Sequence, residues 1–334
     1  MDVLSDVIAL MRTGRPTSAL VRWHAPWGQR FPAVPGSAGF QVVLSGSCLL
    51  EKASGPVRLN PGDVLFLPHG HGYTLLGEPS AQPAEPRWDP TREPALLVRD
   101  TVGEPGSGPV TVTLCGGYKI EAEFAHPLLR ELPEVLHLPA GQPGAAEAVA
   151  LLAREAEEPG LGTDTLLPAL LDVLLLYVLR AYVGGACGPG GACGPGGAAG
   201  TDGEAGRTGW AAALADPAVG AALAAVHTEP DRPWTVASLA ARAGLSRAAF
   251  ARRFHERVGQ PPLAYLTWWR MTTAARLLRT TDTSLSVLAA RSGYTSEYAF
   301  AHAFKRAHGI PPGRFRGGRH DEGTAQTVSL GSPR

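Results

Sequence analysis

Four cysteines are the side chains of this 334-residue sequence best suited to redox chemistry or to holding a soft metal. Two of them, Cys187 and Cys193, lie six residues apart in ACGPGGACGPGG, a unit written twice over residues 186–197. They could close a small disulfide ring, but no His, Lys or Arg within the stretch would lower the pKa of either thiol. The four cysteines also lack the spacing of a tetrahedral zinc site. A module that repairs alkylation through a zinc-activated acceptor cysteine is therefore not expected. Cys187 and Cys193 therefore predict either a redox pair or a spacer without chemistry.

Two histidines could bind a metal. His69 and His71 alternate in PHGHGY, residues 68–73, so both side chains would face the same way along a strand or turn. Together with His24 they would form an imidazole set suited to iron, manganese or zinc. The alternative is that they are solvent-facing or hydrogen-bonded turn histidines.

Charge is distributed unevenly along a chain whose net charge is zero. Residues 216–319 carry 15 Lys and Arg against 6 Asp and Glu, whereas residues 1–215 carry 14 against 22. A basic third attached to an acidic remainder indicates that the C-terminal part meets a polyanion. A solvated basic surface without a partner is the alternative.

The hydrophobic pattern indicates where β structure gives way to helices. From Gly39 to about Thr113, short Val- and Leu-rich runs alternate with Gly and Pro, which favours an antiparallel barrel or sandwich. Helical periods follow, including an apolar run at 165–183 that Pro168, Asp172 and Arg180 interrupt. Because charges are costly at a bilayer centre, we expect a buried or subunit-joining helix and no membrane partner.

A glycine-rich segment separates this part from the next. Residues 184–208 contain 11 glycines and almost no large apolar side chain, so they are typical of a flexible linker. The N-terminus lacks the features of a secretory signal, and the few cysteines suit a reducing compartment. We therefore expect a cytoplasmic protein.

An internal repeat follows the linker. Residues 239–262 and 288–312 superpose with a one-residue insertion after Gly293, and beyond it the shift is 50, which aligns Ser246 with Ser296 and Phe250 with Phe300. In each copy a glycine suits a tight turn, the serine caps a second helix, and two phenylalanines one turn apart anchor that helix to a core. The repeat predicts two helix-turn-helix units, joined by a helix over about residues 262–279, that could enter successive major grooves.

These motifs resemble the DNA-binding domain of AraC-type transcriptional regulators. The resemblance covers residues 210–316 and includes the family's closing pattern at Gly309, Pro312, Phe315 and Arg316. It implies that Arg252 makes a bidentate contact to guanine, and that Arg314 and Arg316 join other cations on the phosphates. The DNA-binding residues that the resemblance and the repeat predict are Arg247, Ala248, Ala251, Arg252, Ser296, Glu297, Tyr298, Ala301, His302, Lys305 and Arg306.

Residues 39–76 resemble the cupin barrel that precedes such domains. Gly46, the sequence NPGD at 60–63 and PHGHGY carry this resemblance, but Gln41 and Tyr73 stand where metal-binding cupins have histidines. The resemblance therefore implies a sensor without a metal or other cofactor. The expected effector-binding residues are Gln41, His69, His71 and Tyr73, with Trp23 as a further lining residue.

Taken together, the sequence predicts an α+β protein that regulates transcription and is not an enzyme. A cupin-like β-barrel would sense a small molecule, redox or stress signal, and the chain would act on promoter DNA as a homodimer, with RNA polymerase as a partner if it activates. A metal-dependent cupin enzyme with an appended DNA-binding domain is the alternative. The predicted parts are a cupin-like sensor (1–140), a helical dimerisation segment (141–183), a Gly-rich linker (184–209), the double helix-turn-helix domain (210–319) and a disordered tail (320–334).

The two readings of the repeated cysteine unit can be separated by substitution. If the unit is a spacer, the double variant Cys187→Ser, Cys193→Ser should bind DNA as the unaltered chain does, in gel shifts with and without oxidant. An oxidant response that is present in the unaltered chain and absent from the double variant would establish the redox pair instead.

Overall fold

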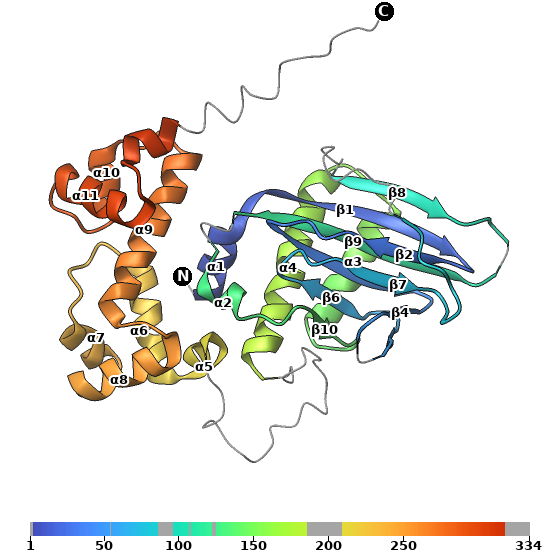
Figure 1. The fold of residues 1–334 in the computed structure, drawn as a ribbon, viewed down its shortest axis with the longest axis horizontal. Coiled ribbons are helices and arrows are strands. Elements are labelled where there is room, and N and C mark those ends of the chain that lie inside the picture. Colours follow the sequence, from blue (N-terminus) through green and yellow to red (C-terminus); the bar gives the residue numbers. More distant parts are fainter. Residues whose placement is uncertain are drawn as a thin grey trace, which may run out of the picture. The chain divides into compact units, whose positions relative to one another are not determined.

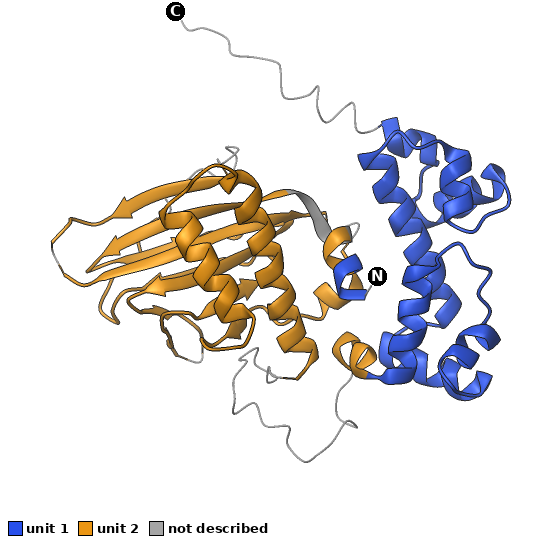
Figure 2. Cartoon of the chain, turned by 180° about the vertical axis from the view of Figure 1, so that it is seen from behind, with its two compact units in different colours: residues 1–6, 216–334 blue, residues 7–215 orange. Residues whose placement is uncertain are grey.

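The structure is a computed structural model that describes residues 3–53, 55–85, 96–106, 108–121, 125–185 and 209–317. The chain divides into two compact units, which Figure 2 colours separately. The N-terminal unit comprises residues 7–215, and the C-terminal unit comprises residues 1–6 and 216–334. A β-rich part is thus followed by a helical part, and the predicted α+β class is confirmed. Cys187, Cys193 and the tail from residue 320 lie outside the described residues.

Two sheets build the N-terminal unit (Figure 1). The six-stranded sheet has the spatial order β10 (Leu136–Leu138), β6 (Val64–Leu67), β3 (Ser37–Ser45), β9 (Val110–Ile120), β1 (Arg12–His24) and β8 (Leu97–Val102). The four-stranded sheet has the order β2 (Gly28–Phe31), β7 (Tyr73–Leu76), β4 (Cys48–Leu50) and β5 (Val57–Leu59). Strand β1 runs antiparallel to β9 and parallel to β8, so the larger sheet is mixed. The β structure begins at Arg12, earlier than the predicted Gly39. The sequence did not reveal β1 and β2, because they lack a regular apolar alternation.

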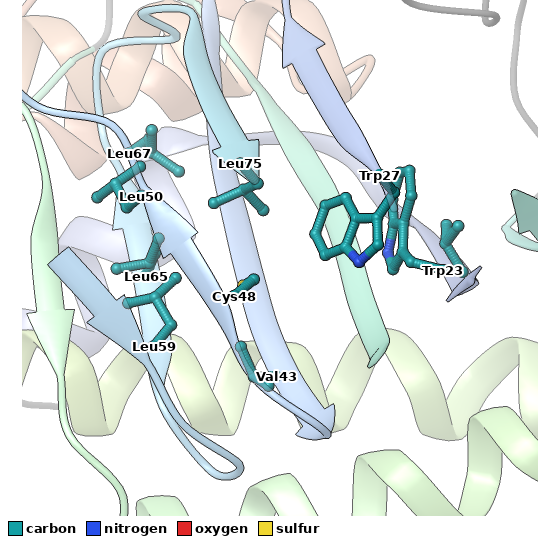
Figure 3. Packing of buried hydrophobic residues seen from close by; sticks show 10 residues of the cluster. Trp23, Trp27, Val43, Cys48, Leu50, Leu59, Leu65, Leu67 and Leu75 are labelled. Carbon is teal, nitrogen blue, oxygen red and sulfur yellow. The ribbon is translucent and has the colours of Figure 1, made fainter. Parts of the chain in front are cut away.

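A buried apolar cluster fills the N-terminal unit beside these strands (Figure 3). Trp23 and Trp27 stack with their ring centroids 4.7 Å apart, while the Trp23 indole N–H donates to Thr113 Oγ1 at 2.9 Å. Each fully buried Leu or Val of the cluster contributes about 1.5–3 kcal/mol relative to exposure. The cluster consists of Val21, Trp23, Trp27, Val43, Cys48, Leu50, Leu59, Leu65, Leu67 and Leu75.

The turn at residues 60–63 is tied to the far edge of the larger sheet by a carboxylate. Asp63 Oδ2 lies 3.1 Å from His137 Nε2 on β10 and accepts from the Asn60 amide at 3.0 Å, while its Oδ1 accepts from the Ala140 amide at 2.8 Å. Burial alone would raise the pKa of Asp63, but these hydrogen bonds outweigh it and hold the pKa below its ordinary value. The NPGD motif therefore fastens β10 onto β6.

Helices α3 (Ala145–Glu157) and α4 (Thr163–Val183) cover one face of the six-stranded sheet, as Figures 1 and 2 show from opposite sides. The inner face of α4 is buried through Leu167, Leu171, Leu174 and Val178. By length and composition α4 could cross a membrane, yet 39% of its most apolar 18-residue stretch is buried within the protein. The apolar run of the sequence is therefore in part a core helix of this unit.

Helix α5 (Trp210–Ala215) belongs to the N-terminal unit, whereas the DNA-binding domain was predicted to begin at residue 210. Trp210 is fully buried, and its ring meets that of His126 edge-on, with the centroids 4.4 Å apart. His126 caps α2 (Pro127–Arg130) by accepting from the Leu128 amide. The unit boundary therefore falls between residues 215 and 216, because Trp210 contacts side chains about 80 positions earlier in the chain.

Helices alone form the described part of the C-terminal unit from residue 216 onward. They are α6 (Pro217–Thr228), α7 (Val236–Arg242), α8 (Arg247–Val258), α9 (Pro262–Thr280), α10 (Leu285–Arg291) and α11 (Glu297–His308). Ser246 accepts from the Ala249 amide and Ser296 from the Ala299 amide, so both predicted N-caps are confirmed. The predicted repeat thus folds as α7–α8 and α10–α11, with α9 between them (Figure 1).

The first residues of the chain complete the core of this unit. Asp6, on α1 (Val3–Met11), lies with Oδ2 3.1 Å from His227 Nδ1, and the other ring nitrogen of His227 lies 2.6 Å from the Tyr265 hydroxyl. All three side chains are buried, and His227 also stacks on Trp269 at 3.8 Å between centroids. Nothing in the local sequence predicted this link, since its partners are more than 200 positions apart.

Asp216 holds the start of α6 to α8. Its Oδ1 accepts from the Ala218 and Val219 amides at 3.0 and 3.2 Å, and its Oδ2 lies 2.5 Å from Arg253 Nε. Burial would raise the pKa of Asp216, but the hydrogen bonds from Arg253 and the two amides prevail, so the pKa lies below its ordinary value. A carboxyl with a depressed pKa stabilises the fold above its unfolded pKa, and this stabilisation is lost as the pH falls through the folded pKa.

Replacing Asp216 should therefore weaken the C-terminal unit. We expect Asp216→Ala to lower the free energy of unfolding by about 2 kcal/mol, because a cap and the partner of Arg253 are both lost. Asp216→Asn retains capping and should lose about 1 kcal/mol. Hydrogen exchange of the α6 and α8 amides in the full chain measures both losses.

The acid dependence and a matched control test the assignment. Below about pH 4 the unaltered chain should lose the stability that Asp216 contributes, and the Asn variant should lack this part of the acid sensitivity. The exposed Asp282 is the control, and Asp282→Ala should leave exchange unchanged. Equal losses for Asp216→Ala and Asp282→Ala would contradict the assignment.

Candidate nucleic-acid interface

The inward side of α8 is set by apolar side chains. Phe250, Phe254 and Val258 are buried, and the two phenylalanine rings lie 5.5 Å apart between centroids. Arg247 and Ala248 are exposed on the first turn of the helix, and Ala251 is half-buried. The burial of the phenylalanines therefore turns the predicted base-facing residues of α8 toward solvent.

Three arginines on α8 have different surroundings. Arg253 and Arg257 lie 2.5 and 3.9 Å from the Asp216 carboxylate, so both face α6. The Arg252 side chain is 77% exposed, and its contact with Glu256 on the next turn is 3.9 Å long. An exposed ion pair of this length contributes little and competes weakly with an anionic ligand. Arg252 is thus the arginine that α8 presents outward, beside Arg247.

Helix α11 has the same construction with different exposed chemistry. Phe300 and Phe304 are buried, while Ser296, Glu297 and His302 are exposed and Ala301 is half-buried. Tyr298 is 83% exposed on the first turn. Lys305 and Arg306 are exposed on the last turn. The predicted residues of α11 therefore lie along one accessible part of that helix.

Helix α9 connects the two helix-turn-helix copies, and its Arg270 makes contacts that the sequence did not predict. Arg270 donates to the carbonyl oxygens of Pro230 and Arg232 at 2.6 and 2.9 Å. The turn glycine of the second copy, Gly293, has φ +71°, and a Cβ there would lie 2.5 Å from Arg270 Nη2. Arg270 thus holds the loop before α7 and lies beside the turn of the second copy, and an arginine inside WWRMTTAARLL is the signal that could have found it.

Arg316 is used within the fold in a way that the sequence did not predict. It is half-buried and donates to the Thr283 carbonyl oxygen, while Arg279 stacks over the Phe315 ring at 4.7 Å. The closing motif therefore packs residues 315 and 316 against α9 and the loop before α10. Arg314 remains exposed.

In the N-terminal unit, two of the predicted effector-binding residues meet inside the fold. Gln41 on β3 is fully buried, and its side-chain oxygen accepts from the Tyr73 hydroxyl at 3.2 Å. Its side-chain nitrogen is buried without a hydrogen-bond partner in the described part of the chain. The Tyr73 ring stacks on Phe31 at 4.5 Å between centroids. This amide therefore has an unused donor in an otherwise apolar setting.

The two predicted histidines lie near each other but differ in their surroundings. Their ring centroids are 5.5 Å apart, and His69 Nε2 lies 2.8 Å from the Leu132 carbonyl oxygen, whereas His71 is exposed. Trp23 is buried in the apolar cluster. Among the residues that the structure describes, no three His, Cys, Asp or Glu side chains gather so that they could hold a metal ion.

The described cysteines are poor nucleophiles. Burial, with a smaller effect of the Asp63 charge, raises the pKa of the Cys48 thiol to about 12. Burial also raises the pKa of the Cys115 thiol to about 12. Since only the thiolate attacks oxidants or binds metal, both groups are unreactive near neutral pH.

A small apolar cavity lies between the six-stranded sheet and α4. Its lining includes Phe40, Phe66 and Tyr118 from the strands and Leu171 and Val178 from α4. None of Gln41, His69, His71 and Tyr73 is among the lining residues. The predicted effector-binding residues and this cavity are thus separate features.

Comparisons with known proteins agree with both halves of this arrangement. A cupin family model matches residues 2–184, and a helix-turn-helix domain model matches residues 239–318. A putative AraC-like transcription regulator of Streptomyces lividans is 34% identical over 321 residues, covering 95% of this chain and 98% of that protein. The HTH-type transcriptional regulator AlkR of Acinetobacter baylyi is 25% identical over 327 residues, covering 95% and 99%.

Among solved structures, the DNA-binding domain of AdpA in complex with a target DNA is 34% identical and covers 33% of this chain and 98% of that chain, with a TM-score of 0.31. The family model for the first half and the full-length relative together decide the family. The chain belongs to the AraC-type transcription regulators, DNA-binding proteins in which a cupin-like N-terminal domain precedes a helix-turn-helix domain.

Proposed function

We propose that the C-terminal unit reads promoter DNA by inserting α8 and α11 into two successive major grooves. The observation that carries this proposal is the exposure of one side of each helix, while paired phenylalanines bury the other. The 19 residues of α9 extend about 28 Å, which is comparable with the spacing of roughly 34 Å between grooves.

The exposed side chains divide into base readers and phosphate ligands. Arg252 and Arg247 suit hydrogen bonds to guanine. Ala248 and Ala251 offer apolar contact to a thymine methyl group. His302 offers a hydrogen-bond donor on a side chain shorter than that of arginine. Lys305 and Arg306 bind phosphates, which position the protein without specifying sequence. Ser296, Glu297 and Tyr298 lie where α11 would enter the groove, and Glu297 accepts a hydrogen bond from cytosine.

The cupin-like domain senses the effector at Gln41 and Tyr73, with His69 and His71 nearby. The unused side-chain donor of Gln41 supports this assignment, because a buried amide N–H without a partner costs about 1–3 kcal/mol unless a ligand or water accepts from it. The effector would therefore offer a hydrogen-bond acceptor. The protein has no catalytic role of its own and acts on transcription in the cytoplasm, contacting RNA polymerase if it activates.

The outer face of α4 joins two copies of the chain. Leu166 and Val173 are 47% and 40% exposed, two turns apart, and Leu170 and Tyr177 lie half-buried on the same stripe. An apolar stripe with this spacing is typical of a helix that packs against a second helix. Burying this stripe in a homodimer would present four recognition helices, α8 and α11 of each protomer, to paired half-sites.

Arg252→Ala should remove selectivity. Loss of one bidentate guanine contact costs about 1–3 kcal/mol, so binding to the preferred site should fall about 5- to 150-fold while binding to scrambled DNA stays nearly constant. Genomic fragments enriched by the full-length protein provide the preferred site, and gel shifts on both DNAs measure the ratio.

Lys305→Ala is the matched control on the second helix. A phosphate contact should be lost equally on both DNAs, and the slope of log affinity against log salt should become shallower by about one. A uniform loss for Arg252→Ala on preferred and scrambled DNA would remove its base-reading role. Absence of enriched genomic sites would overturn DNA reading itself.

The double variant Leu166→Asp, Val173→Asp should be monomeric, because two charges would be buried without partners in the proposed dimer. Light scattering after size exclusion measures the mass. Leu151→Asp on α3, at a site 42% exposed, is the control and should leave the mass unchanged. A dimer that persists in the double variant would place the interface elsewhere.

A further inference from the structure

A guanidinium near the middle of α9 binds the loop that leads into α7. Arg270 Nε donates to the Pro230 carbonyl oxygen at 2.6 Å, and its Nη2 donates to the Arg232 carbonyl oxygen at 2.9 Å. Burial lowers the pKa of Arg270 below its ordinary value, and Tyr294 and Asp231 act in the opposite direction. The Arg270 side chain is thus partly removed from water, with groups from two other segments close to it.

The bound loop is attached to the first helix-turn-helix copy. The Trp234 amide donates to the Arg232 carbonyl oxygen at 2.7 Å, and the Trp234 indole N–H donates to the Glu229 carbonyl oxygen at 2.9 Å. Trp234 is buried, and the next residue, Thr235, caps α7 by accepting from the Ser238 amide at 3.0 Å. A displacement of this loop would therefore displace α7, and with it α8, which packs against α7.

The same guanidinium lies against the turn of the second copy. Gly293, between α10 and α11, has φ +71°, and a Cβ at this position would lie 2.5 Å from Arg270 Nη2 and 2.6 Å from the Asp231 carbonyl oxygen. The Tyr294 ring, next along the chain, meets the Phe300 ring of α11 edge-on, with the centroids 6.0 Å apart. The turn is therefore attached to α11, as the loop is attached to α7.

The corresponding turn glycine of the first copy differs in its surroundings. Gly244 has φ +67°, close to that of Gly293, but a Cβ there would meet no atom of the described residues within 4 Å. Both positions require glycine for their backbone conformation, and Gly293 is also required by a close approach. We call Arg270, residues 230–232 and Gly293 the junction, because they bring the two copies into direct contact.

We propose that Arg270 is a positioning residue that fixes the orientation of α8 relative to α11, and thereby the spacing of the two DNA segments that one chain reads. This inference rests on the proposed function, because it concerns how the two recognition helices act together. Helices α8 and α11 each pack against α9, which runs between the two copies (Figure 1). Without the junction, their relative orientation would depend on these two separate contacts alone.

A fixed orientation makes the spacing of the DNA segments part of what the protein recognises. One extra base pair between the segments moves the second by about 3.4 Å and rotates it by about 35°, since a helical turn of about 34 Å contains about 10 base pairs. A rigid pair of helices loses base contacts on such DNA, whereas a loosely connected pair can follow the change. The junction therefore predicts one preferred spacing.

Residual dipolar couplings of the backbone amides, measured without DNA in the full-length protein, test whether Arg270 fixes the orientation. In the unaltered chain, one alignment tensor should describe α8 and α11 together. Arg270→Met keeps the aliphatic stem but donates to neither carbonyl oxygen, so the two helices should require different tensors while their amides keep their protection from hydrogen exchange. A common tensor in the folded Arg270→Met variant would overturn the proposal.

The two turn glycines provide a matched pair of variants. Gly293→Ala places a methyl group against the junction, while Gly244→Ala adds similar backbone strain at a place outside the junction. Gly293→Ala should therefore give α8 and α11 different tensors, and Gly244→Ala should leave them with one. This pair keeps the proposal testable if Arg270→Met does not fold, and equal effects of the two alanines would count against it.

Selection of binding sites from a random DNA library, with the same full-length proteins, measures the consequence for DNA reading. The unaltered chain should select two segments at one separation, and separations changed by one base pair should be about tenfold rarer, because base contacts are lost. In Arg270→Met this preference should fall to about threefold or less, because a loosened connection lets both helices bind. A preference that stays about tenfold in this variant would overturn the proposal.

The two measurements keep this proposal apart from the proposed function. Failure of the unaltered chain to select any DNA would count against DNA reading. The couplings are measured without DNA, so they would still decide whether Arg270 fixes the orientation of the two helices.

Discussion

Burial of two phenylalanines one turn apart, on each of α8 and α11, is the constraint on which the DNA-binding unit depends. A helix has no preferred rotation about its own axis until one side is removed from water. Phe250 with Phe254, and Phe300 with Phe304, decide that rotation in the two copies. Every exposed side chain of the reading helices takes its direction from this burial.

Electrostatics then distinguishes among cations that share a helix. Asp216 is buried and engages Arg253 and Arg257, so these two arginines stabilise the fold. Arg252, one residue from Arg253, points away from that carboxylate and stays exposed. The same carboxylate caps α6, so one buried side chain both ends α6 correctly at its N-terminus and holds it to α8.

The N-terminal unit combines an apolar interior with a few polar groups of defined direction. Its apolar cluster raises the pKa of Cys48, and Cys115 is likewise held as a neutral thiol. Within this interior the Tyr73 hydroxyl orients the Gln41 amide and leaves one donor unused. Such a group is costly in a protein core, because an unpaired buried donor has given up its hydrogen bonds to water.

Local sequence patterns were enough to predict the class of the protein and the construction of its two recognition helices, α8 and α11. Caps, turn glycines and phenylalanines one turn apart act over a few residues, so their spacing predicted Ser246, Ser296 and the faces of α8 and α11. The tertiary structure alone decided that Arg253 differs from Arg252, that Asp6 reaches His227, and that Trp210 belongs to the N-terminal unit. Each of these depends on a partner between 37 and 221 positions away, and contacts between distant residues form through packing that no local pattern records.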